Sequence, residues 1–185
     1  LPLPATTDGV RVSCNYANAD SNNSCCELRL TRLMEWLPKG APLLAGMPSD
    51  VMRAMARDEN VKLIDYYNLE EIQIKNAVPT VEGAIAIAMK ELPITLLGSE
   101  CTVLGYGRIG KRLAYVLHAL GANVTVCARS EKDLSSARIA GCKALRLSDY
   151  QMCPCVADIL FNTVPTNILT IDMLDKMPPK MLIIE

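Results

Sequence analysis

Residues 101–110 constrain the fold of this chain more than any other stretch. A short apolar run from Cys101 to Leu104 is typical of a buried strand, and glycines follow at positions 105, 107 and 110. After them, apolar residues recur with the spacing of a helix that has one apolar face. These residues are Ile109, Leu113, Val116, Leu117 and Leu120. A second apolar strand at 123–128 completes an order that predicts a doubly wound parallel sheet.

Each glycine of this motif has its own physical reason. Gly105 permits the tight turn from strand to helix, Gly107 lets a pyrophosphate approach the backbone, and Gly110 allows close packing of helix and strand. The helix start also presents unpaired N–H groups and a partial positive charge. We therefore expect a dinucleotide to bind at Gly105, Tyr106, Gly107, Arg108, Ile109 and Gly110. The alternative is a sheet that keeps this turn and binds nothing.

The end of the second strand predicts which nicotinamide cofactor binds. Folds that bind NAD usually place Asp or Glu there to hold the ribose 2′-hydroxyl. This chain has Arg129 and Ser130 instead, and a guanidinium and a hydroxyl can both donate to a 2′-phosphate. The pattern favours NADP(H) over NAD(H). The alternative is that Ser130 only caps the next helix, with Asp133 close to capping-box spacing, and that Arg129 is a solvated surface charge.

A loop after the fourth strand of this domain is the second candidate contact. In a doubly wound sheet the ligand lies at the carboxyl ends of the first and fourth strands, where the strand order reverses. We expect Asn162, Thr163, Val164 and Pro165 to face the nicotinamide end of the cofactor. The alternative is a turn that Pro165 fixes, without contact to the cofactor.

The remaining chain alternates apolar strands with amphipathic helices, which predicts an α/β fold of parallel βαβ units. Residues 97–185 predict a Rossmann domain whose strands, joined by right-handed crossovers, take the spatial order 3-2-1-4-5. Residues 1–78 predict part of a smaller flavodoxin-like domain, with an extended strand at 9–14 and a polar loop at 17–25.

Between these domains we expect an interdomain helix and linker at residues 79–96. Residues 76–79 end in a proline and predict a hinge after a short helix at 69–75. Thr80 is a good N-cap for a new helix, which would continue to Leu92 before Pro93 ends it.

Composition narrows the classes of function. The formal net charge of −1 gives no sign of a nucleic-acid or anionic-membrane surface, and no apolar run reaches the ~20 residues of a membrane span. The chain has eight cysteines, several inside apolar strand patterns, as is typical of free thiols in a reducing compartment. Cys153 and Cys155 have no second pair at metal-ligand spacing, and His118 lies outside the apolar stripe of its helix. We predict neither a metal site nor a histidine base.

Several segments together resemble one family. The chain is similar to the A subunit of dipicolinate synthase at residues 1–4, 76–84, 91–95, 103–110 and 161–165. The resemblance runs along nearly the whole chain, and the segments 76–84 and 161–165 are more specific than the glycine motif. The architecture is also similar to that of D-2-hydroxyacid dehydrogenases. Leu1 in place of Met, and a strand pattern that stops at Glu185, lead us to expect an internal fragment.

This resemblance implies an oxidoreductase of a spore-forming bacterium, in the cytoplasm of the mother cell. The implied reaction is the NADP-dependent oxidation of dihydrodipicolinate to dipicolinate. The implied partner is the flavoprotein-like B subunit of the synthase, and a homo-oligomer is compatible with the family. Neither a nucleic acid nor a membrane is expected as a partner, and no catalytic residue is assigned. Two alternatives stay open, namely an NAD(P)-dependent 2-hydroxyacid dehydrogenase and a non-catalytic nucleotide-sensing domain.

Overall fold

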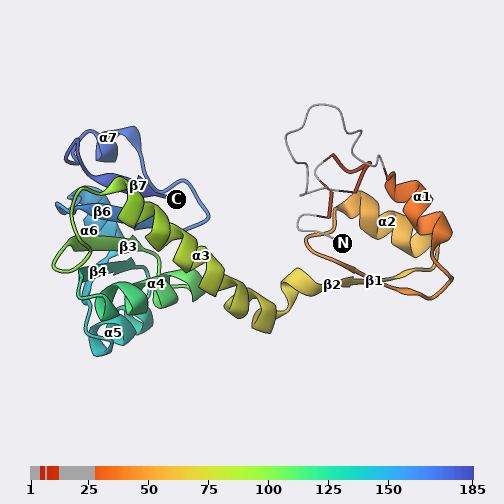
Figure 1. Cartoon of the computed structure of the whole chain (residues 1–185), viewed down its shortest axis with the longest axis horizontal. Helices are drawn as coiled ribbons and strands as arrows, with labels where there is room; N and C mark the ends of the chain where they lie inside the picture. Colours follow the sequence, from red (N-terminus) through yellow and green to blue (C-terminus); the bar gives the residue numbers. More distant parts are fainter. Residues whose placement is uncertain (1–4, 7, 13–27) are drawn as a thin grey trace. The chain divides into compact units, whose positions relative to one another are not determined.

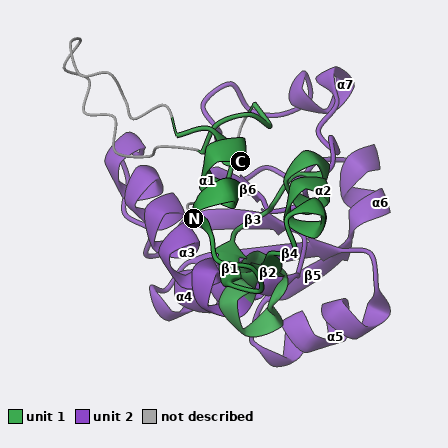
Figure 2. Ribbon diagram, turned by 90° about the vertical axis from the view of Figure 1, so that its right-hand side faces the viewer, with its two compact units in different colours: residues 1–73 green, residues 74–185 purple. Residues whose placement is uncertain are grey.

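The computed structural model describes residues 5, 6, 8–12 and 28–185. The chain divides into two compact units, residues 1–73 and residues 74–185, which are drawn in two colours in Figure 2. The polar loop predicted at 17–25 and the resembling segment at 1–4 lie outside the described residues.

The described part of the first unit contains a pair of parallel strands. β1 (Pro42–Ala45) pairs with β2 (Lys62–Asp65), and α1 (Leu30–Trp36), α2 (Asp50–Asp58) and the 3₁₀ turn η1 (Tyr66–Asn68) accompany them (Figure 1). Ser49 caps α2, because its Oγ accepts a hydrogen bond from the Met52 N–H at 3.2 Å. The buried core of the unit consists of Ala5, Leu30, Met34, Leu43, Ala45, Met52, Ala56 and Val61.

Of the strand predicted at 9–14, the structure describes residues 9–12. Its described part contributes a single antiparallel bridge, between Arg11 and Arg29, and residues 13 and 14 lie outside the described residues. The Asp8 carboxylate accepts hydrogen bonds from the N–H groups of Val10 and Arg11, both at 2.8 Å. These local bonds favour a turn over an extended strand.

The second unit is built on a five-stranded parallel sheet. Its strands are β3 (Glu100–Leu104), β4 (Asn123–Ala128), β5 (Lys143–Arg146), β6 (Ile159–Asn162) and β7 (Leu182–Ile184). They lie in the order β5-β4-β3-β6-β7. In chain order this is 3-2-1-4-5, so the predicted doubly wound topology is confirmed. The strand order reverses at β3, which places its carboxyl end beside that of β6.

Helices cover both faces of this sheet. On one face α3 (Glu70–Glu91), α4 (Arg108–Ala119) and α5 (Glu131–Ile139) contribute Val81, Leu113 and Leu134 to the core around Val103 and Val126. On the other face lie α6 (Leu147–Met152) and α7 (Ile171–Leu174), with Tyr150 and Met173 packed around Leu104. Two separate cores thus flank one sheet, as the alternating elements predict.

The expectation of a break between two helices at 76–79 is wrong. Residues 70–91 form the single helix α3, with Pro79 inside it, and Thr80 does not begin a new helix. The Thr80 hydroxyl donates to the carbonyl of Asn76 at 2.9 Å, one turn back along the same helix. A proline in a helix interior costs about 3 kcal/mol, and burial of Val81, Ile85 and Ala88 against the sheet offsets that cost. The division between the units falls inside this helix, between Gln73 and Ile74, while the domain ranges 1–78, 79–96 and 97–185 stay a prediction.

Candidate dinucleotide-binding site

The turn from β3 into α4 is held together by close backbone packing. Gly105 has φ +93°, a conformation that residues with a side chain rarely adopt, and its N–H donates to the Cys127 carbonyl at 2.8 Å. A Cβ on Gly105 would lie 2.7 Å from Thr163 Oγ1, and a Cβ on Gly110 would collide with the Gly105 carbonyl. Both positions therefore require glycine for the packing of the protein itself.

Gly107 differs from the other two glycines. Its φ of −78° is open to any residue, and no heavy atom of the described residues lies within 4 Å of the Cβ that a side chain would add there. It is also the N-cap of α4, and among the residues that the structure describes no side chain caps this helix. The N–H groups of the first turn are consequently left for another acceptor. Open space over a glycine at an uncapped helix start fits the approach of a pyrophosphate.

A pocket of about 340 Å³ lies at the carboxyl ends of β3 and β4, and we call it the Arg129 pocket. Eight of the predicted site residues line it: Gly105, Tyr106, Gly107, Arg129, Ser130, Thr163, Val164 and Pro165. Arg129 is exposed directly after β4, and within the described part of the chain its guanidinium has no hydrogen bond or ion pair. The cation is thus available to an anionic ligand.

Ser130 is an N-cap, which is the alternative that its spacing to Asp133 suggests. Its Oγ accepts from the Asp133 N–H at 3.1 Å and donates to Asp133 Oδ2 at 2.7 Å. Asp133 also lines the Arg129 pocket, which sequence reasoning missed. The capping-box spacing was the available signal, because it returns the Asp133 side chain to the helix start.

Lys111 joins this polar group from α4. Its Nζ lies 3.6 Å from Asp133 Oδ1 and 5.5 Å from the centre of the Tyr106 ring. Tyr106 is buried, and burial raises the pKa of its hydroxyl. A cation near the ring face is favourable, so Lys111 ties the glycine turn to the start of α5.

The loop at 162–165 is fixed mainly by its own hydrogen bonds. Thr163 donates to the Leu104 carbonyl twice, from its hydroxyl at 2.8 Å and from its N–H at 3.0 Å. Asn162 Oδ1 accepts from the Val164 N–H at 3.1 Å, and Asn162 Nδ2 donates to Glu185 Oε1 at 2.8 Å. The Thr163 side chain thus serves the β3–α4 turn, while the predicted contact of this loop with a cofactor stays a prediction.

A second pocket, of about 320 Å³, lies between α3, α4, β6 and β7, and we call it the Asn162 pocket. Ile109, Asn162 and Thr163 line it, together with apolar residues such as Phe161 and Ile184. The predicted loop is therefore divided, because Val164 and Pro165 line only the Arg129 pocket while Thr163 lines both. Gly110 is buried under the turn and Arg108 is exposed at the first residue of α4; neither lines these pockets.

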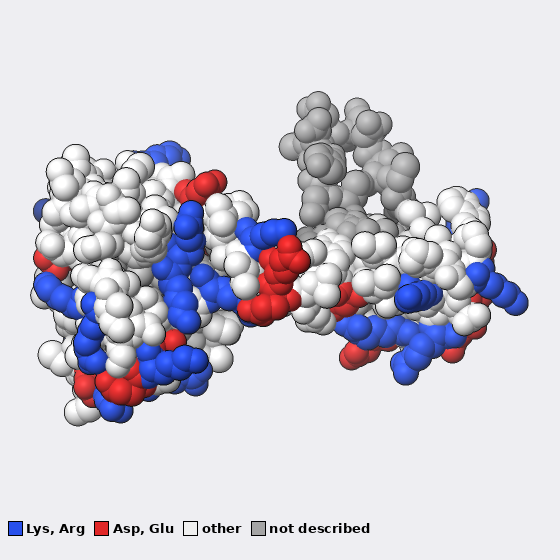
Figure 3. All heavy atoms as spheres, turned by 90° about the horizontal axis from the view of Figure 1, so that it is seen from below, with Lys and Arg blue, Asp and Glu red and all other residues white. Residues whose placement is uncertain are grey.

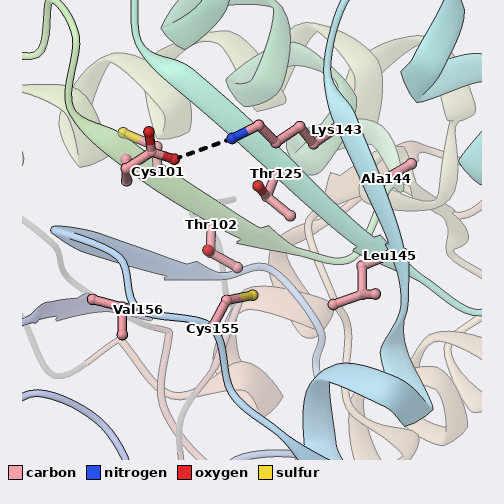
Figure 4. A pocket seen from close by; sticks show the side chains of 9 residues that line it. Cys101, Thr102, Thr125, Lys143, Ala144, Leu145, Cys155 and Val156 are labelled. Carbon is pink, nitrogen blue, oxygen red and sulfur yellow. Dashed lines mark ion pairs between the residues drawn. The ribbon is translucent and has the colours of Figure 1, made fainter.

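A third hollow, of about 360 Å³, lies toward the amino ends of the strands (Figure 4). Thr102, Thr125 and Cys155 line it, and Lys143 forms an ion pair with Glu100 at 3.6 Å beside it. Burial raises the pKa of the Cys155 thiol, so this group is a poor nucleophile. None of the predicted site residues is here.

The described residues hold neither a metal-type cluster nor a membrane-type helix. No three His, Cys, Asp or Glu side chains among them gather in a way that could hold a metal ion. None of their helices combines the length and the apolar character needed to cross a membrane. Acidic and basic side chains are mixed on the face seen in Figure 3, in keeping with the formal net charge of −1.

The geometry agrees with comparison to known proteins. Residues 75–185 match the model of the D-isomer specific 2-hydroxyacid dehydrogenase, NAD binding domain. The chain belongs to this family. Membership of this family indicates a nicotinamide dinucleotide cofactor and a fold that oxidoreductases use. The open glycine turn at Gly107 agrees with such a cofactor.

The chain is also similar to the A subunit of dipicolinate synthase, as its sequence motifs predict. It is 32% identical to that protein from Bacillus subtilis (strain 168) over 185 residues, which are all of this chain and 60% of the relative. The crystal structure of dipicolinate synthase, A chain, from Bacillus subtilis matches with a TM-score of 0.81 at 33% identity, over 99% of this chain and 59% of the other. The counterpart from Bacillus halodurans matches at 0.85 and 27% identity, over 99% and 61%. The chain thus spans about 60% of the length of these relatives.

Proposed function

We propose that the second unit binds NADP(H) across the β3–α4 turn and that it does so within a dipicolinate synthase. The activity proposed for the whole protein is the oxidation of dihydrodipicolinate to dipicolinate, with the flavoprotein-like B subunit of the synthase as partner. The proposed setting is the mother-cell cytoplasm of a sporulating bacterium. Similarity to the A subunit of dipicolinate synthase, over the whole of this chain, supports this reading.

The observation that carries the proposal is the open space at Gly107. Gly105 and Gly110 are explained by packing inside the protein, whereas Gly107 has ordinary dihedral angles and, among the described residues, no neighbour within 4 Å of an added Cβ. Packing does not require a glycine there, so a ligand that must come close to the backbone explains it. The N–H groups at the start of the twelve-residue helix α4 suit the pyrophosphate.

The two pockets on either side of this turn suit the two halves of a dinucleotide. Arg129 would meet the 2′-phosphate of the adenosine half in the Arg129 pocket, because its guanidinium is available there. Asn162 and Thr163 would border the nicotinamide half in the largely apolar Asn162 pocket, and the loop at 162–165 would contact both halves. The bound nicotinamide supplies hydride transfer, while these residues bind the cofactor and fix its orientation.

One observation favours a second candidate function. The match of residues 75–185 to the 2-hydroxyacid dehydrogenase domain suits an NAD(P)-dependent dehydrogenase of a 2-hydroxy acid. The exposed Arg129 in the place of a strand-end acid weighs against an NAD-dependent enzyme. This candidate predicts turnover of a 2-hydroxy acid without a second kind of polypeptide.

Activity of the full-length protein separates the two. We would supply enzymatically generated dihydrodipicolinate and NADP, with and without the flavoprotein-like partner, and follow the absorbance of dipicolinate. A parallel series would use a panel of 2-hydroxy acids with NAD and NADP. Dipicolinate formation supports the first reading, and turnover of a 2-hydroxy acid alone supports the second. Binding of neither nucleotide, measured by the fluorescence of NADPH and NADH, would overturn both.

A further inference from the structure

The Arg129 pocket contains a carboxylate as well as a guanidinium. Asp133 lines the pocket from the first turn of α5, with 32% of its side chain exposed. Both carboxylate oxygens have a partner, since Oδ2 accepts from Ser130 Oγ at 2.7 Å and Oδ1 lies 3.6 Å from Lys111 Nζ. The carboxylate is therefore held in place at the pocket wall.

Ser130 has no hydroxyl proton to spare for a phosphate in this arrangement. Its single proton goes to the Asp133 carboxylate, and its oxygen accepts from the Asp133 N–H. Of the two neighbouring residues Arg129 and Ser130, Arg129 is therefore the one that can donate a hydrogen bond to a 2′-phosphate. The other charged side chain in the pocket wall is Asp133, which is negative. Its carboxylate repels a phosphate but accepts a hydrogen bond from a ribose hydroxyl.

We propose that Asp133 is a specificity-determining residue that acts against the 2′-phosphate and so limits the NADP(H) preference that Arg129 confers. The proposal rests on the proposed function, in which the adenosine ribose enters the Arg129 pocket. NAD-binding folds usually carry an acidic residue at the end of this strand. Here the strand end carries the cation Arg129, and the acidic residue, Asp133, comes from the following helix. Lys111 moderates the effect, because its ammonium lies beside Asp133 Oδ1.

The two nucleotides should therefore bind with a moderate difference in affinity. NADPH gains the Arg129 interaction but is repelled by the Asp133 charge. NADH has neither effect, and its 2′-hydroxyl can donate to the side-chain oxygen at position 133, which an Asn would keep as an acceptor. Removing the negative charge at 133 should favour NADPH alone. Removing Lys111 should have the opposite effect, because the carboxylate would lose its nearby positive charge.

The test compares Asp133→Asn with Glu131→Gln in the full-length protein. Both variants remove one negative charge from the first turn of α5, but Glu131 does not line the pocket and pairs with Arg138 and Arg146 at 3.0 and 3.1 Å. The Asn side chain keeps an acceptor for Ser130 Oγ. NADPH and NADH affinities would be measured by nucleotide fluorescence at low and high salt.

We expect Asp133→Asn to tighten NADPH binding by about three- to tenfold at low salt and to leave NADH nearly unchanged. The gain should shrink as salt screens the charges, and Glu131→Gln should change neither affinity. Lys111→Gln should weaken NADPH several-fold, and it tests the same charge if Asp133→Asn does not fold. An unchanged NADPH/NADH ratio in Asp133→Asn, or an equal change in Glu131→Gln, overturns the inference. Wild-type protein that binds neither nucleotide overturns the proposed function instead.

Discussion

The glycine turn joins two regions of opposite character. Around Gly105 and Gly110 the backbone is packed so closely that a single added carbon would meet Thr163 or the Gly105 carbonyl. At Gly107, only a few residues away, the same added carbon meets no atom of the described chain within 4 Å. Identical residues in one motif therefore serve two purposes, a closed joint between strand and helix and an open edge that a ligand can reach. The difference separates variants that disturb the fold from variants that disturb binding.

The largest effect should come from Gly110→Val, which changes the closed joint. The branched side chain would enter the space of the Gly105 carbonyl, and backbone cannot move aside as a flexible side chain can. We expect a loss of at least about 3 kcal/mol in the free energy of unfolding, or no folded protein. Chemical denaturation measures it. A Gly110→Val protein of normal stability would contradict the closed joint.

Gly107→Val should lose nucleotide binding but keep the fold. Its φ of −78° and ψ of −159° suit a branched residue, so stability should fall by only about 1 kcal/mol, because valine is a poor N-cap. The side chain would occupy the approach of the pyrophosphate. Titration with NADPH and NADH checks the loss, with Gly107→Ala as a graded control that should bind more weakly than wild type. Normal binding by Gly107→Val would place the cofactor elsewhere.

The contrast among these glycines also indicates how far sequence could predict the structure. The motif predicted the turn, the helix and the strand order, because these depend on local spacing and on the handedness of crossovers. It also predicted that Gly107 is the open position of the motif. It did not predict which residues close the joint around Gly105, since Thr163 and Val164 come from a distant loop. Likewise Pro79 is a local signal for a break, whereas the burial that keeps α3 continuous comes from the sheet.

Asp133 shows the same limit at the candidate site. Its spacing to Ser130 predicted a helix cap, and the cap is present. That its carboxylate also lines the Arg129 pocket depends on how the turn after β4 directs the start of α5 toward the glycine turn. Such a placement comes from the packing of β4 against β3, which no local pattern specifies.

Arg129→Asp tests whether the cation in the Arg129 pocket binds the 2′-phosphate. A charge-assisted hydrogen bond contributes ~1.5–3 kcal/mol, so NADPH affinity should fall about tenfold or more, while NADH should gain relative to it. Lys132→Asp is a matched charge reversal, since Lys132 is exposed three residues later and does not line the pocket. It should leave the NADPH/NADH ratio unchanged. If Arg129→Asp and Lys132→Asp weaken NADPH equally, the effect is one of general charge and not of a 2′-phosphate contact.

Ser130→Ala should have the smallest effect on binding, because Ser130 belongs to the fold although it lines the pocket. Its hydroxyl accepts from the Asp133 N–H and donates to the Asp133 carboxylate, so its loss removes a helix cap. We expect a loss of about 1 kcal/mol in the free energy of unfolding and an unchanged NADPH/NADH ratio. Thermal or chemical unfolding would measure the stability, and titration of both nucleotides would measure the ratio.

Ser130→Thr is the matched control for this last variant, since threonine also caps helices and should restore most of the stability. The two variants together distinguish two outcomes. A ratio that falls in Ser130→Ala and recovers in Ser130→Thr would mean that the hydroxyl turns from Asp133 to the phosphate when NADPH binds. Loss of stability in Ser130→Ala with an unchanged NADPH/NADH ratio would mean that Ser130 serves the fold, although it lines the Arg129 pocket. Ser130 would then be a residue that lines a pocket without binding the ligand of that pocket.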